Sequence, residues 1–249
     1  MGVEYRRYLL PRPNFFRPTP EALANLVDAL RQERWILAPS APERATLPFA
    51  TMTYYAHARN TGFYVRQDET YESGPAENLG AFLAARKNTD LLLAWPVESL
   101  AASGLRYPLE SPPSDGEDVY FEIQLHLSRD YAYHCSEVVD PFDEPPVCAC
   151  GTNLEYQPDY EQDPFGAARI SAECPECGAP FNPTKLPCTV RDPWTGDEQT
   201  LPGGLTYRFA VVIDCGKCFG EAGMSFAADL KHLVESTLGV ATYEVEDVY

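Results

Sequence analysis

The chain has 249 residues, of which 45% are hydrophobic and 12% aromatic, so it can fold around a substantial core. Its formal net charge is −18, with 37 acidic residues against 19 lysines and arginines. A field of that sign repels nucleic-acid backbones and anionic membranes, which excludes them as expected partners. The charge favours a cationic partner, such as a basic protein, or serves only to keep the protein in solution.

The first residues and the hydropathy of the chain favour the cytoplasm. Residues 1–8 contain no apolar segment of the length that a secretory signal requires, and no stretch reaches the ~18 apolar residues of a membrane span. In that compartment the eight cysteines are expected as metal ligands, reactive thiols or buried thiols before disulfides. The preference for arginine over lysine, with abundant alanine and proline, indicates a GC-rich bacterial source.

Hydrophobic periodicity predicts an α+β protein with a mixed sheet and about three helices. The first helix is expected over residues 20–33, because the capping hydroxyl of Thr19 precedes a proline at the first helical position. Its apolar face follows helical spacing and consists of Leu23, Leu26, Val27 and Leu30. A second helix is expected over residues 77–87, and a third begins with Ser225 as its cap and ends at Gly239.

The strands are expected in β-rich or alternating runs at residues 3–10, 35–37, 51–55, 62–65, 91–95, 119–127, 131–135, 206–214 and 241–245. Residues 51–55 and 62–65 are expected to pair, and residues 131–135 to pair with residues 119–127. The run 91–95 is apolar throughout, which predicts a strand buried on both faces. In residues 119–127 polar and apolar side chains alternate, which predicts a half-buried strand with Glu122, Gln124 and His126 on one face.

The distribution of these elements predicts a body and an insertion. Residues 1–140 and 201–249 are expected to form the α+β body, and residues 141–200 an inserted subdomain. The acidic excess lies mainly in the second half of the chain, because residues 141–249 hold 18 acidic and 6 basic residues.

The strongest chemical motif is a pair of short cysteine turns within the insertion. Cys148 and Cys150 form the first turn, Cys174 and Cys177 form the second, and a glycine follows each. A tetrahedral zinc site needs four such ligands, and a short turn brings two thiolates to one side of the metal. The glycine can adopt the left-handed conformation that lets turn N–H groups face sulfur. We therefore predict a structural zinc ion bound by all four cysteines.

Over about residues 146–183 this motif resembles a zinc ribbon. The resemblance implies that the metal is structural and that the hairpin tips contact protein or nucleic acid. The single residue between Cys148 and Cys150 departs from the usual pattern, and four buried thiols without metal are the alternative. A β-hairpin is expected between the turns, where acids alternate with aromatics: Glu155, Tyr156, Asp159, Tyr160, Glu161, Asp163 and Phe165. This tip is expected either to dock on a basic protein or simply to be solvated.

A second Cys-x-x-Cys motif, Cys215 and Cys218, follows a predicted strand and leaves three interpretations open. It can be a redox dithiol, or a tight turn whose thiols pack inward. It can also be half of a second metal site, whose other ligands would come from Cys135, Cys188, His134 or His232. No metalloprotease or deaminase motif, phosphate-binding glycine loop or nucleophile elbow is present, which favours a protein that is not an enzyme.

These observations predict a cytoplasmic, non-catalytic protein-binding or inhibitor-like protein with an acidic interaction surface. Small immunity proteins against nuclease toxins work in this way, and the comparison rests on charge alone. The alternative is a thiol-dependent or metal-dependent enzyme that uses Cys215 and Cys218. A nucleic-acid-binding ribbon is disfavoured, because the only cations of residues 141–200 are Arg169, Lys185 and Arg191.

Overall fold

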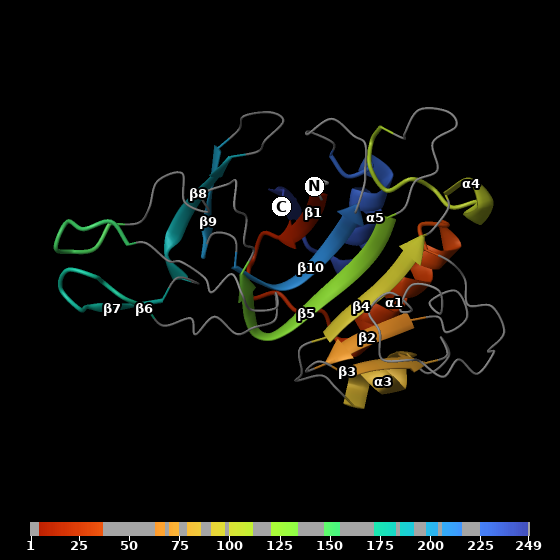
Figure 1. The fold of residues 1–249 in the computed structure, drawn as a ribbon, viewed down its shortest axis with the longest axis horizontal. Helices are drawn as coiled ribbons and strands as arrows, with labels where there is room; N and C mark the ends of the chain where they lie inside the picture. The colour runs from red at the N-terminus through yellow and green to blue at the C-terminus, as the bar shows by residue number, and fades with distance from the viewer. Residues whose placement is uncertain are drawn as a thin grey trace.

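A seven-stranded antiparallel sheet, with strand order β11-β1-β10-β5-β4-β2-β3, forms the centre of the protein (Figure 1). The computed structural model describes residues 5–36, 63–67, 70–74, 79–85, 91–97, 100–111, 121–133, 147–154, 172–182, 185–191, 198–203, 206–215 and 225–248. The strands of this sheet are β1 (Tyr5–Pro11), β2 (Phe63–Gln67), β3 (Thr70–Gly74), β4 (Leu91–Val97), β5 (Phe121–Tyr133), β10 (Thr206–Cys215) and β11 (Thr242–Val248). The predicted strand at residues 51–55 lies outside the described residues.

Two helices of more than eight residues occur in the described part of the chain, α1 (Pro20–Gln32) and α5 (Ala228–Leu238). Two shorter helices, α3 (Leu79–Ala85) and α4 (Leu100–Ser103), have seven and four residues. The α+β class is therefore confirmed, but the expectation of about three helices is wrong, since two of the described helices exceed eight residues. The predicted second helix is shortened to α3.

The start of α1 follows the local signals of its sequence. The hydroxyl of Thr19 accepts a hydrogen bond from the backbone N–H of Ala22 at 3.1 Å, and Pro20 occupies the first helical position. All four residues of the predicted apolar face are buried: Leu23, Leu26, Val27 and Leu30. These predictions are confirmed because each depends on contacts within a few residues of the chain.

The start of α5 differs from the prediction. Its N-cap is Ala227, which makes no side-chain capping bond, and the expected cap Ser225 lies two residues earlier. Ser225 precedes the helix because the chain here is extended beside residues 108–110: Phe226 forms a β-bridge with Leu109, and Ala227 N–H donates to Pro108 O. The end of the helix is as predicted, since Gly239 adopts the left-handed conformation with φ 65°.

Every pairing between neighbouring strands of the large sheet is antiparallel, so the expectation of a mixed sheet is wrong. The succession β10–α5–β11 does give two strands that run in the same direction, as expected of a helical crossover. They are not neighbours, because β1 lies between them and pairs antiparallel with both. Sequence order indicates the crossover, but it does not reveal the strand inserted between its two ends.

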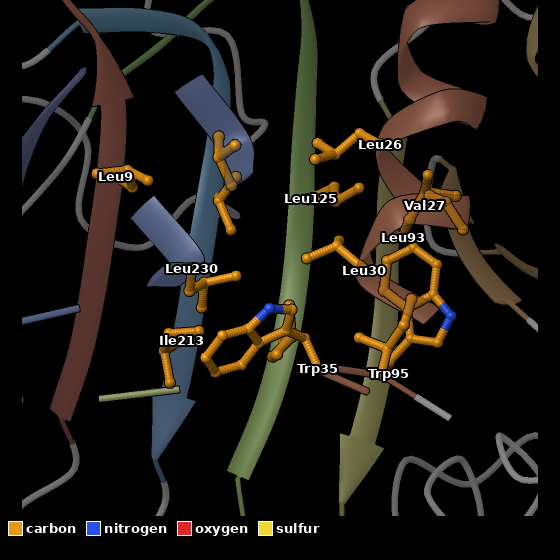
Figure 2. Packing of buried hydrophobic residues seen from close by; sticks show 14 of the residues in the cluster. Leu9, Leu26, Val27, Leu30, Trp35, Leu93, Trp95, Leu125, Ile213 and Leu230 are labelled. Carbon is orange, nitrogen blue, oxygen red and sulfur yellow. The ribbon is translucent and has the colours of Figure 1, made fainter. Parts of the chain in front are cut away.

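The face of the sheet that α1 and α5 cover carries the main hydrophobic core (Figure 2). The helices contribute Leu26, Val27, Leu30 and Leu230, and the sheet contributes Leu9, Leu93, Trp95, Leu125 and Ile213. Trp35, which follows α1, is only 1% exposed and inserts its ring into this core. Residues 35–36 therefore fill part of the hydrophobic core and do not form the predicted strand. Each large apolar side chain buried here contributes about 1.5–3 kcal/mol.

The second face of the sheet is also buried. Its hydrophobic cluster consists of Tyr8, Leu10, Leu201, Tyr207, Ala210, Val212, Tyr243 and Val245. On β5, Glu122, Gln124 and His126 alternate with core residues of the first face and are 3%, 8% and 2% exposed. The prediction of a half-buried strand is wrong, because these polar side chains find partners inside the protein rather than water. For β4 the prediction of burial on both faces is confirmed at Leu93 and Ala94.

Strand β5 is longer than predicted, and residues 131–133 continue it instead of forming a second strand beside it. The pairing of β5 with β4 ends at Leu127, whereas the pairing with β10 resumes at Ala132 opposite Tyr207 and reaches Tyr133 opposite Thr206. An irregularity between Tyr207 and Phe209 accommodates the extra length. Residues 128–131 have no paired position on β10, so the polar residues 128–130 belong to a bulge within β5 and not to a turn between two strands.

Two small sheets lie to one side of the main sheet (Figure 1). One pairs β6 (Ala172–Glu173) with β7 (Pro180–Phe181), and the other pairs β8 (Pro187–Arg191) with β9 (Glu198–Pro202). Within the described ranges, neither sheet pairs with the main sheet. The division into a body and an inserted subdomain at residues 141–200 stays a prediction. No helix in the described ranges is long and apolar enough to cross a membrane.

Candidate metal centre

Two turns of related geometry carry the four cysteines of the first motif. In the first, Gly151 N–H donates to Cys148 O at 2.8 Å, and in the second, Gly178 N–H donates to Cys174 O at 2.9 Å. Both glycines have left-handed backbone, with φ 91° and φ 68°. Any other residue would strain the backbone at these positions, although its Cβ would meet no atom within 4 Å. The predicted role of the glycines is thus confirmed.

A further backbone hydrogen bond closes each turn, and its span differs between the two turns. Cys148 N–H donates to Thr152 O at 2.8 Å, and Cys174 N–H donates to Ala179 O at 2.9 Å. The second turn spans one residue more, in keeping with its longer cysteine spacing. A β-bridge between Val147 and Asn153 continues the first turn, and the pairing of β6 with β7 continues the second.

The turns place the four sulfur atoms together, all within 4.8 Å of one another. Cys148 Sγ lies 3.6 Å from Cys177 Sγ, and Cys150 Sγ lies 3.7 Å from Cys174 Sγ. A tetrahedron of thiolates around a metal at about 2.3 Å has sulfur–sulfur edges of about 3.8 Å. The spacing therefore fits four ligands of one ion and is far longer than the bond of about 2 Å in a disulfide. The four cysteines lie close enough to hold a metal ion.

The ionisation of the thiols is uneven. The hydroxyl of Thr152, and then its backbone N–H, hold the pKa of Cys150 down to about 6. The backbone N–H of Ala179 favours the thiolate of Cys177, but the three neighbouring cysteine side chains outweigh it and raise the pKa of Cys177 to about 12. Cys150 thus ionises readily, whereas ionisation of Cys177 is disfavoured, because negative sulfur atoms repel one another. A divalent cation at the centre removes this conflict.

Exposure also differs among the ligands. Cys174 is 2% exposed and faces inward, whereas Cys150 and Cys177 are exposed. The donor set is nevertheless closed, since four protein thiolates complete a tetrahedron and leave no position for a substrate or an activated water. The arrangement can therefore hold a fold together, and it is poorly suited to Lewis-acid catalysis.

Comparisons of the chain with known protein families, with curated proteins and with solved structures found no significant match.

The second cysteine motif is only partly within the described residues. Cys215 ends β10, is 1% exposed and belongs to the helix-side core. Cys218, Cys135 and His134 lie outside the described residues, and His232 is exposed on α5. In the part of the chain that the structure describes, Cys148, Cys150, Cys174 and Cys177 are the only group of His, Cys, Asp or Glu close enough to hold an ion. Burial of Cys215 favours the inward-packed interpretation of this motif.

The sequence predicted that turn N–H groups face sulfur, but it did not identify Thr152 and Ala179 as their source, nor the hydroxyl of Thr152 as a further group. The hydroxyl and N–H of Thr152 and the N–H of Ala179 act on sulfur, and each residue stands two positions after a cysteine and directly after a glycine. The repeated Cys-Gly-x pattern was the available signal, because a left-handed glycine turns the next N–H toward the preceding side chain. The acidic and aromatic tip over residues 155–165 lies outside the described residues.

Proposed function

We propose that this chain is a cytoplasmic, non-catalytic protein-binding protein in which Cys148, Cys150, Cys174 and Cys177 hold a structural zinc ion. The observation that carries the proposal is the closed group of four sulfur atoms at the spacing of a tetrahedral site. Four soft thiolates favour zinc or iron over harder cations, and zinc suits a purely structural role because it has no redox chemistry.

Protein binding is supported by the surroundings of this centre. Glu173 and Glu176 are exposed beside the second turn, and Val147, next to the first, is 62% exposed. An apolar side chain within an acidic surface suits a partner that supplies basic groups around an apolar contact. The net charge of −18 extends the same preference over the whole chain. An inhibitor of a basic protein, comparable to an immunity protein, is the form of this function that we propose.

An enzyme acting through Cys215 and Cys218 is the alternative. A reactive thiol needs partial exposure and an electropositive environment. Cys215 is 1% exposed and stands next to Asp214, so the observed environment gives this alternative less support.

Elemental analysis of the purified chain tests the metal. We expect one zinc per chain in the natural protein and in Cys215→Ala, and loss of that zinc in Cys174→Ser. Replacement by cobalt(II) should give the intense sulfur-to-metal absorption of a four-thiolate site. Iron in place of zinc, or no metal in any preparation, would contradict the zinc assignment.

Affinity capture from native lysate at low and high salt tests the partner. A basic protein is expected at low salt and should be lost at high salt, because exposed charges are screened over about 10 Å at 0.1 M salt. A partner whose capture ignores salt, or the absence of any partner, would count against an acidic binding surface. A glycine-rich basic peptide of matched charge serves as the control for unspecific attraction.

A further inference from the structure

A row of buried polar side chains crosses the second face of the sheet, outside the metal centre. Glu122, Gln124 and His126 occupy alternate positions of the central strand β5, and Tyr207 of β10 continues the row. None of the four is more than 8% exposed. Buried polar residues are costly unless they are paired, so four in one row within an apolar cluster call for an explanation.

The hydrogen bonds of the row all run in one direction. Gln124 Nε2 donates to Glu122 Oε1 at 2.7 Å, so the amide oxygen of Gln124 is left to accept. His126 Nε2 lies 2.7 Å from that oxygen and must carry the hydrogen. His126 Nδ1 is then the acceptor for the hydroxyl of Tyr207 at 3.2 Å. This assigns a neutral imidazole with its proton on Nε2.

The row ends at the carboxyl group of Glu122, in which only one of the two oxygens has a described hydrogen-bond partner. Oε2 of Glu122 is buried and has no hydrogen-bond partner among the described residues. On β10, Asp214 stands directly opposite Glu122, and on β4 the opposite residue is Pro96. Arg6 of β1 is the nearby cation, but its Nε donates to Asp214 at 2.9 Å. Glu122 thus accepts one described hydrogen bond, from Gln124, and lies opposite an acidic residue, so its burial favours the neutral acid.

The protonation states follow from this environment. Burial raises the pKa of Glu122 to about 8, with Asp214 adding to the effect while Gln124 and Arg6 oppose it. Burial lowers the pKa of His126 to about 3, so its ring stays neutral at neutral pH. Of these two groups, Glu122 alone changes charge in the mildly alkaline range.

The other end of the row lies where the β8–β9 hairpin joins the sheet. Leu201 of β9 belongs to the same buried cluster as Tyr207. The adjoining turn is fixed by Thr206 Oγ1, which donates to Gly203 O at 2.7 Å, and by Gly203 N–H, which donates to Leu186 O at 2.6 Å. Packing on the second face therefore also attaches the β8–β9 hairpin to the main sheet.

We propose that the row from Glu122 to Tyr207 is a proton-linked latch that holds the β8–β9 hairpin against the second face of the sheet while Glu122 is protonated. When Glu122 releases its proton to solvent, a second negative charge arises beside Asp214 inside the protein. Hydration of that charge requires the second face to open. The contact of Leu201 with the cluster is then lost, and the hairpin detaches from the body.

Hydrogen exchange of the full, metal-loaded chain tests this latch. After correction for intrinsic exchange, protection of the β8–β9 amides should fall about tenfold from about pH 7 to about pH 9, because opening is linked to one proton at a pKa near 8. Glu122→Gln, which keeps the acceptor for Gln124, should remove this pH dependence. Glu110→Gln, which changes an exposed acid, should behave like the natural protein.

Two results would overturn the proposal. One is a loss of β8–β9 protection with the same pH dependence in Glu122→Gln. The other is a side-chain carboxyl of Glu122 that titrates near its ordinary value of 4.5 in carbon-detected NMR of the unmodified protein. The NMR titration needs no variant, so it decides the question even if Glu122→Gln does not fold.

Discussion

Cys150 Sγ lies 3.7 Å from Cys174 Sγ, although 24 positions separate the two residues in the chain. Between the two turns, the described contacts are sulfur to sulfur, and the strand pairings stay within each turn. A shared ion is therefore the natural cross-link, because neutral thiols attract one another weakly and thiolates repel.

Removal of this cross-link should loosen the turns and spare the body. Cys150→Ser, or treatment with a chelator, is expected to lower zinc affinity more than about 100-fold and to speed amide exchange in residues 147–154 and 172–182. Exchange in β1, β5 and β10 should be unchanged, because their core does not include the cysteine turns. Global unfolding of the chelated protein, seen as simultaneous exchange everywhere, would contradict a local role for the metal.

Thr152 should tune the metal without binding it. Its hydroxyl favours the thiolate of Cys150, so Thr152→Val is expected to weaken zinc binding about tenfold. Thr152→Ser keeps the hydroxyl and is the matched control, with expected affinity close to that of the natural protein. Competition with a coloured chelator measures both. Equal losses in the two variants would show that the methyl group, and not the hydroxyl, matters.

Two glycines should respond to alanine with opposite signs. Gly239 caps α5 with φ 65°, so Gly239→Ala is expected to lower the free energy of unfolding by about 1 kcal/mol. Gly80 lies within α3 without a positive φ, so Gly80→Ala is expected to raise it by up to about 1 kcal/mol. Neither new Cβ meets an atom within 4 Å, so the difference isolates backbone conformation. Denaturant titration measures both, and a shared sign would refute this account.

Arg106 ties the end of α1 to α5, and stacking should dominate its contribution. Its guanidinium lies 4.0 Å from the centre of the Trp35 ring and also pairs with Asp229, which is 74% exposed. Arg106→Ala is expected to destabilise the protein by about 1 kcal/mol through the lost cation–π contact. Asp229→Asn should change stability by less than about 0.5 kcal/mol, since exposed ion pairs contribute little. A larger effect of Asp229→Asn in denaturant titration would reverse this ranking.

Local chemistry explains which predictions from sequence succeeded. The cap at Thr19, the end of α5 at Gly239 and the two cysteine turns each depend on groups close together in the chain. Secondary-structure propensity does not bring these turns together in space, but four cysteines at the sequence spacing of metal ligands are typical of a shared metal site. The site could therefore be anticipated before its geometry was known.

Long-range partners explain which predictions failed. The alternation in β5 was interpreted as exposure to water, yet Glu122, Gln124 and His126 bond to one another and to Tyr207. Periodicity identifies the two faces of a strand and cannot say what covers each. The same limit applies to β1, whose place between β10 and β11 is set by pairings with strands at the far end of the chain.

The pH dependence of stability should show two limbs, one from each of two titrating residues of the buried row, Glu122 and His126. The pKa of Glu122 is raised from 4.5 to about 8, so its contribution is full below 4.5 and is lost as pH rises through 8. The pKa of His126 is lowered from 6.5 to about 3, so its contribution is full above 6.5 and is lost as pH falls through 3. Between 4.5 and 6.5 the two slopes oppose each other and nearly cancel.

Above pH 6.5 only the slope from Glu122 remains, and below pH 4.5 only the slope from His126. On each side the free energy of unfolding should change by about 2 kcal/mol over about 1.5 pH units. Glu122→Gln should flatten the alkaline limb alone, because its amide does not titrate. His126→Gln, which keeps a donor and an acceptor, should reduce the acid limb alone, although other carboxylates leave part of that limb in place. Denaturant titrations from about pH 3 to about pH 9 measure the three curves. If either substitution changed the limb assigned to the other residue, Glu122 and His126 would have to titrate as one coupled unit.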